Sequence, residues 1–79
     1  MSNHEPVIHW SLGIPHSATV AARDGGYWEL SVRHARAASR WSWKVSHSHD
    51  KRCDCGMTST AQFALLNAER AMKELDQAP

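Results

Sequence analysis

Asp24-Gly-Gly-Tyr-Trp-Glu-Leu-Ser-Val-Arg33 is the stretch that decides the fold of this chain. Asp-Gly is the strongest short-range signal for a β-hairpin turn. After the turn the residues alternate, so Trp28, Leu30 and Val32 share one face of a strand. Tyr27, Glu29, Ser31 and Arg33 share the other face. The pattern therefore predicts a half-buried strand that follows a hairpin turn.

A second alternating run extends from residue 40 to residue 49. One of its faces is mainly aromatic and carries Trp41, Trp43, Val45, His47 and His49. The opposite face is polar and carries Arg40, Ser42, Lys44, Ser46 and Ser48. The small and polar residues 34–39 predict a loop between the two strands, although their alanines would also fit a helical turn. Cys53–Met57 predicts one more short strand.

The last element is predicted to be a helix. Ser59 and Gln62 fit a capping box at its start. Small and apolar residues then recur at helical spacing along one face, and so many alanines imply a close approach to a sheet. Phe63 and Leu66 lie off this stripe and either widen the buried face or form an exposed apolar spot. The stripe is Ala61, Ala64, Leu65, Ala68, Ala71, Met72 and Leu75.

Together these elements predict one small α+β domain over residues 1–79. We expect a frayed start at 1–6, a sheet at 17–57 and a helix at 59–76. The sheet is an antiparallel meander of three to four strands packed on the one C-terminal helix. The helix should cover the tryptophan face and leave the opposite sheet face open to solvent.

Size and composition narrow the function. A 79-residue chain buries only roughly 60% of its unfolded surface, which leaves little room for a deep catalytic cleft. We therefore expect no enzyme. Neither a signal peptide nor an apolar run of membrane-spanning length is visible. Two cysteines do not make a disulfide framework, so a reduced, cytoplasmic protein is expected.

The run His47-Ser-His49-Asp-Lys-Arg-Cys53-Asp-Cys55 gathers both cysteines and two histidines. If the turn is the three residues 50–52, His49 lies opposite Cys53 and His47 lies opposite Cys55. Directly opposed residues share a face. The four side chains would then form a zinc site that staples a thin core.

The alternative is a turn of two residues. The register then slips by one, and the cysteines move to the face opposite the histidines. In that case the cysteines are small half-buried hydrophobic residues, and no cofactor is expected. A Cys–His nucleophile pair is a further reading of the same run, but the sequence shows no orienting third group for it.

Positive charge gathers in the middle of the chain, although the net charge is only +1. We expect Tyr27, Arg33, Arg40 and Lys44 on the open sheet face, with Arg36 in the neighbouring loop. Guanidinium groups beside an aromatic ring suit acidic or aromatic protein surfaces and phosphate backbones. A simple solvated face is the alternative. Nucleic-acid-binding domains usually carry a larger positive excess, so a protein partner is at least as consistent with the charge.

Residues 17–75 also resemble a known class of protein. Asp24-Gly-Gly-Tyr-Trp-Glu-Leu-Ser-Val32, Trp41-Ser-Trp-Lys-Val45 and the capped Ala-rich helix are similar to small orphan proteins of proteobacteria and their prophages. In size and style the chain also resembles the phage-encoded anti-CRISPR proteins, which inhibit host defence complexes by binding them. The resemblance implies a non-enzymatic inhibitor that occludes a surface of a host protein complex. We expect the chain to be a monomer or a homodimer. A nucleic-acid-binding module and a zinc-stapled interaction domain are the alternatives.

Overall fold

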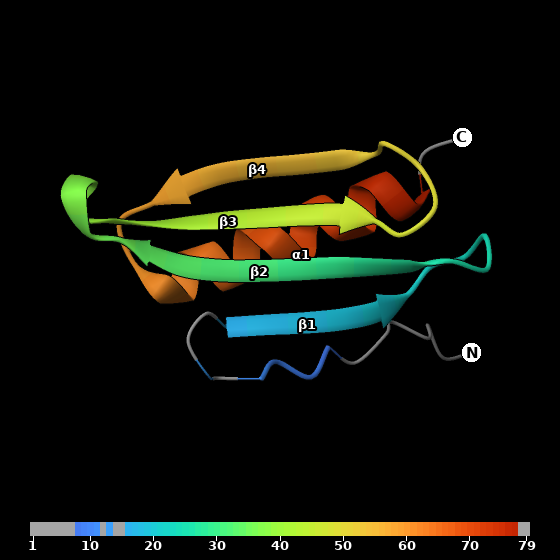
Figure 1. Ribbon diagram of the computed structural model, residues 1–79, viewed down its shortest axis with the longest axis horizontal. Coiled ribbons are helices and arrows are strands. Elements are labelled where there is room, and N and C mark those ends of the chain that lie inside the picture. Colours follow the sequence, from blue (N-terminus) through green and yellow to red (C-terminus); the bar gives the residue numbers. More distant parts are fainter. Residues whose placement is uncertain (1–7, 12, 14–15, 78–79) are drawn as a thin grey trace, which may run out of the picture.

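The predicted sheet and helix are both present in the computed structural model, which describes residues 8–11, 13 and 16–77. The predicted frayed start at residues 1–6 lies outside this part of the chain. Neighbouring strands pair antiparallel in the order β1-β2-β3-β4, and α1 packs across one face of the sheet (Figure 1). The α+β meander is thereby confirmed. The bounds are β1 His16–Ala21, β2 Tyr27–Ala35, β3 Arg40–His47, β4 Cys53–Thr58 and α1 Ala61–Gln77.

The turn between β1 and β2 is the hairpin that the Asp-Gly pair predicts. Ala22 N–H donates to the carbonyl of Gly26 at 2.9 Å. Gly25 has a φ of 99°, a conformation that a residue without a Cβ adopts easily. The carboxylate of Asp24 accepts the N–H of Gly26 at 3.1 Å, which closes the turn from within.

The connection between β2 and β3 is shorter than the predicted loop at residues 34–39. β2 continues to Ala35, whose partner across the sheet is Arg40. A single 3₁₀ turn, η1 (Arg36–Ala38), and the left-handed Ser39, with a φ of 51°, then reverse the chain. Pairing with β3 extends β2 beyond the residues whose own pattern indicates a strand.

The helix begins one residue later than predicted. Its first residue is Ala61, and Thr60 Oγ1 accepts the N–H of Phe63 at 3.2 Å. Thr60 is therefore the N-cap, and the assignment of Ser59 and Gln62 to a capping box is wrong by one residue. Ser59 and Thr60 are equivalent candidates for the N-cap from sequence alone, because each carries a hydroxyl that can accept a backbone N–H.

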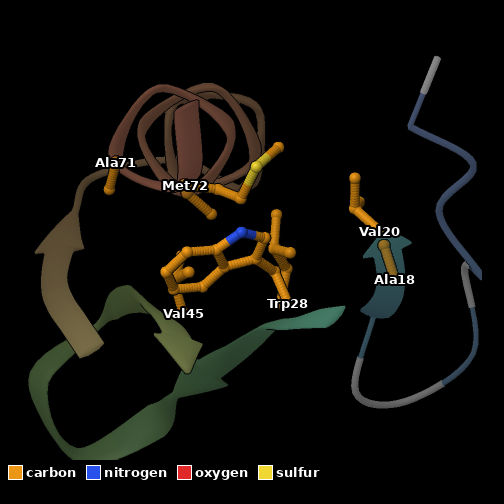
Figure 2. Packing of buried hydrophobic residues seen from close by; sticks show 8 residues of the cluster. Ala18, Val20, Trp28, Val45, Ala71 and Met72 are labelled. Atoms are coloured by element: carbon orange, nitrogen blue, oxygen red, sulfur yellow. The ribbon is translucent and has the colours of Figure 1, made fainter. Parts of the chain in front are cut away.

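The core lies between the helix and the tryptophan face of the sheet. Trp28 is fully buried against Val45 and Met72, and Figure 2 shows its indole between the helix and the strands. The indole N–H is not left unpaired, because it donates to Asp76 Oδ1 at 3.1 Å. Ala68, also fully buried, allows the helix backbone to approach the sheet closely.

The two apolar residues that lie off the helix stripe are exposed. Phe63 and Leu66 keep 57% and 50% of their surface, so they form an apolar spot on the outer side of α1 and do not widen the core. Within the described residues, no helix has both the length and the apolar character that a membrane span requires.

Candidate functional site

The open face of the sheet is a polar surface with small side chains at its centre. Cross-strand rows place polar side chains next to each other, because Ser17 pairs with Ser31 and Glu29 pairs with Ser46. Two shallow hollows of about 430 and 390 Å³ lie on this face, on either side of Lys44.

The predicted basic residues gather on one half of this face. Arg33 lies opposite Ser42, Lys44 lies opposite Ser31, and Arg40 lies opposite Ala35 at the end of the strands. Arg36 follows immediately in η1. All four are exposed. Tyr27, the fifth predicted contact, is exposed at the opposite end of β2, roughly 20 Å from Arg33 along the strand.

The four basic side chains on this half have no ion-pair partner among the described residues. Arg52 and His47 form ion pairs with Asp24 and Asp50, away from this half of the sheet. Arg33, Arg36, Arg40 and Lys44 also make no side-chain hydrogen bond. Their charges are therefore available to a partner.

A pocket of about 340 Å³ lies at the η1 end of the sheet. The indole of Trp41 forms one wall, stacked on His16 at 6.1 Å between ring centroids and tilted against His34 at 4.9 Å. Arg33 and Arg36 also line it. Aromatic walls with guanidinium groups at the rim suit a flat or acidic group of a partner.

The sequence did not indicate this pocket. Its rings come from three strands, and only the register that pairs His34 with Trp41 brings them together. The alternation placed Trp41 on the tryptophan face, where it was expected under the helix. The register confirms this face, but Trp41 lies at the end of the sheet and is only half-buried there. The pairing of the two strand ends was the one signal that could have placed His34 beside it.

The structure does not bring together the four predicted zinc ligands. Ser46 lies opposite Cys53 and Lys44 lies opposite Cys55, so both cysteines face the open side of the sheet. His47 is buried on the helix side, where its ring contacts Trp28 at 4.7 Å. The three-residue turn is therefore wrong. Residues 48–52 lie between the two strands, but His47 donates its N–H to the Arg52 carbonyl and Ser46 pairs with Cys53, so the register is that of an even-numbered turn and separates cysteines from histidines.

The Cys–His nucleophile pair fails for the same reason. His49 lies beside His47, with 5.9 Å between ring centroids, and not beside a thiol of β4. His47 uses both ring nitrogens within the protein. Nδ1 accepts the N–H of His49 at 3.1 Å, and Nε2 donates to Asp24 Oδ1 at 3.0 Å. This geometry assigns the proton to Nε2 and leaves neither nitrogen for catalysis.

The pairs around His47 tie the two hairpin turns together. Asp24 belongs to the β1–β2 turn, while Asp50 and Arg52 belong to the β3–β4 turn. Arg52 binds both carboxylates, with Nε donating to Asp50 Oδ2 at 2.9 Å and Nη2 donating to Asp24. Its guanidinium also lies 5.1 Å from the centre of the Trp28 ring. We call these four residues, Asp24, His47, Asp50 and Arg52, the turn cluster.

Three members of the turn cluster have the residue types of a metal site. The ligand atoms of Asp24, His47 and Asp50 lie within 4.8 Å of one another. Arg52 already neutralises both carboxylates. A metal ion would have to displace this guanidinium and break the bonds of His47, so the arrangement is better described as an ion-pair network.

The turn cluster shifts the pKa values of its members. Asp24 accepts hydrogen bonds from the Gly26 N–H, from Arg52 and from His47, and these hold the pKa of its carboxyl far below the ordinary range. Hydrogen bonds from the side chain and the backbone of Arg52 lower the pKa of Asp50. The same contacts with Asp50 and Asp24 raise the pKa of Arg52.

The sign of these shifts predicts a pH-dependent stability. A carboxyl whose pKa falls on folding stabilises the protein above the unfolded pKa of about 4, and this contribution is lost as the pH falls through the folded value. Asp50→Asn should therefore lower the melting temperature at pH 7, and the difference from wild type should shrink below about pH 4. Thermal melts from pH 7 to pH 3 measure this.

Asp54→Asn is the matched control for that series. Asp54 is exposed on β4, outside the turn cluster, where it accepts the N–H of Cys55. A difference between Asp50→Asn and wild type that stays constant over the whole pH range would contradict the ion-pair role of Asp50.

No protein-family model matches this sequence, and the comparisons with curated proteins and with solved structures found no match.

Proposed function

We propose that this protein is a small, non-enzymatic binding domain that docks the basic half of its open sheet face on an acidic surface of a partner protein. The observation that carries the proposal is a set of four exposed cations that have no partner among the described residues. They are Arg33, Arg36, Arg40 and Lys44, which lie together at one end of the sheet.

Arg52, in contrast to these four residues, is a cation with a structural role. It is partly buried, contacts two carboxylates and packs over Trp28. Arg33 and its neighbours are surrounded by serines and alanine, which leave the guanidinium donors unsatisfied by protein. Arginine is enriched at binding interfaces, because its planar group binds carboxylates through two parallel hydrogen bonds.

The Trp41 pocket lies at the same end of the sheet as the basic residues but on its tryptophan face, so it can extend the interface around that end. Binding energy is concentrated in a few residues, among which Trp, Tyr and Arg are enriched. Trp41, Arg33 and Arg36 line this hollow, so an acidic or aromatic side chain of a partner that reaches around the end of the sheet would meet the indole close to the cations.

Nucleic acid is the second candidate partner, and one observation favours it. Ser17 and Ser31 lie in one cross-strand row with Lys44, and Ser42 lies opposite Arg33 on the same open face. Hydroxyl groups beside cations are common phosphate contacts. The face also carries Glu29 at its centre, and the whole chain has a net charge of only +1. Both features favour a protein partner over a polyphosphate.

The specific role that we propose is inhibition by occlusion, of the kind that anti-CRISPR proteins exert on host defence complexes. The support is the resemblance in size and pattern together with a docking face that needs no catalytic group. Inhibition would follow from covering a surface of the target complex.

Charge reversal on the open face tests the proposal. Arg33→Glu should weaken partner binding by at least about tenfold, since it removes a cation at the centre of the interface and adds a repulsive charge. The protein used as bait on immobilised resin identifies partners, and titration calorimetry with the purified partner measures the affinity.

Arg70→Glu is the matched control, because it makes the same change in charge on the exposed side of α1. It should leave binding unchanged. Equal binding by wild type and Arg33→Glu would overturn the proposal. A nucleic acid as the bound component, with an affinity that falls steeply with salt on a log–log plot, would favour the second candidate.

A further inference from the structure

Three sulfur atoms lie in a row on the open face of β4. Cys53, Cys55 and Met57 alternate with Asp54 and Gly56, so the register places all three side chains on one side of an edge strand. The sequence pattern paired these cysteines with histidines. In the structure they share a face of the sheet with a methionine instead.

All three sulfur-bearing side chains are accessible. Both cysteines are free and exposed, and Met57 keeps 49% of its surface. A disulfide between the cysteines is disfavoured, because residues two apart on an extended strand have Cα atoms about 6.5–7 Å apart, at the limit for a bridge. The strand geometry therefore keeps two thiols side by side without joining them.

The spacing suits a metal ion better than a covalent bond. Metal–thiolate bonds of about 2.3 Å allow two sulfurs on one ion to be up to about 4.6 Å apart. Strand side chains lean along the strand, and each cysteine sulfur has to move only about 1 Å toward the other to reach this separation. The longer and flexible Met57 can then supply a third ligand from the same side.

We propose that Cys53, Cys55 and Met57 form a binding site for a soft monovalent metal ion, Cu(I). Thiolate and thioether groups are the ligands that select Cu(I). Zinc prefers four ligands from Cys, His and carboxylate side chains. The histidine of the turn cluster faces the other side of the sheet, and Met57 is not a zinc ligand, so this row fits the softer ion.

The charge around the row is compatible with this ion. Binding releases the two thiol protons, and the complex of Cu(I) with two thiolates carries one negative charge. Lys44 is the cross-strand partner of Cys55, and both line the same hollow of about 390 Å³. Its ammonium group offsets that charge at close range.

Competition for Cu(I) tests the site. The full chain is titrated under anaerobic, reducing conditions into Cu(I) held by the chromophore bicinchoninate. Wild type should withdraw one Cu(I) per chain, with a thiolate-to-metal absorption band in the ultraviolet. Removal of even an outer-shell partner of a metal ligand weakens binding by roughly 10–100-fold, so Met57→Leu should lose at least about tenfold and Cys55→Ser should lose more.

His49→Gln and Ser46→Ala are the controls, and circular dichroism confirms that each variant is folded. Both should bind Cu(I) as wild type does. Wild-type affinity in the Cys53→Ser/Cys55→Ser double variant would overturn the site. A loss in His49→Gln as large as that in Cys55→Ser would also overturn it, because the ligands would then include the histidines.

Discussion

Trp28→Ala is expected to lower the free energy of unfolding by about 3–5 kcal/mol. Trp28 is 0% exposed and packs on both β3 and α1, so the truncated side chain leaves a cavity between sheet and helix. The substitution also removes the donor to Asp76 and the ring that supports Arg52 and His47. A domain of this size has little stability to spare, and we expect it to be largely unfolded at 37 °C.

Urea denaturation followed by circular dichroism measures this effect, and Trp41→Ala is the matched control. Trp41 is half-buried at the edge of the pocket and lies outside the core cluster. The control should remain folded at 37 °C. A Trp28→Ala variant that unfolds at the same urea concentration as Trp41→Ala would show that the helix is held on the sheet by other contacts.

Gly56→Val is expected to cost about 1–3 kcal/mol, which corresponds to a fall in melting temperature of about 4–8 °C per kcal/mol. A Cβ at Gly56 would lie 2.8 Å from three atoms of the Trp43 indole, Cε2, Cζ2 and Nε1. These atoms belong to one rigid ring system, so the whole indole has to move away from the sheet. The better strand propensity of valine opposes this loss but is smaller, with a range of about 1 kcal/mol.

Cys55→Val is the control for this position, because it introduces the same side chain on the same edge strand. Cys55 faces the open side, where it is exposed. Its melting temperature should equal or slightly exceed that of wild type. Equal melting of Gly56→Val and wild type would mean that the indole of Trp43 has room to shift without loss.

The local residue pattern was sufficient to predict the strands, the helix and the buried face of each. The alternation of Trp28, Leu30 and Val32 predicts which face is buried, because a strand has a period of two and one face must exclude water. The same reasoning places Arg33 and Lys44 on the open face. The helix stripe correctly includes Ala64 and Ala68, which are both fully buried.

The residue pattern was a weaker guide to the exact ends of the elements and to the candidate sites. Thr60 rather than Ser59 caps the helix, since neighbouring hydroxyl residues offer equivalent caps and the geometry of the chain entering the helix selects among them. The Trp41 pocket depends on rings from three strands, and no local signal relates His16 to Trp41.

The sequence by itself determined the strands, the amphipathic helix and the two faces of the sheet, because these follow from side-chain periodicity along a single segment. Only the tertiary structure decided on which face of the sheet the two cysteines lie. Ser48 donates its N–H to Tyr27 and accepts the N–H of Tyr27 on its hydroxyl, while Asp24 binds both His47 and Arg52. These contacts with the other hairpin accompany a register in which Ser46 pairs with Cys53 and His47 donates its N–H to the Arg52 carbonyl. This register differs by one residue from one that would pair His47 with Cys53, so it turns the thiols away from the histidines and onto the face of Met57, since a shift by one residue exchanges the two faces.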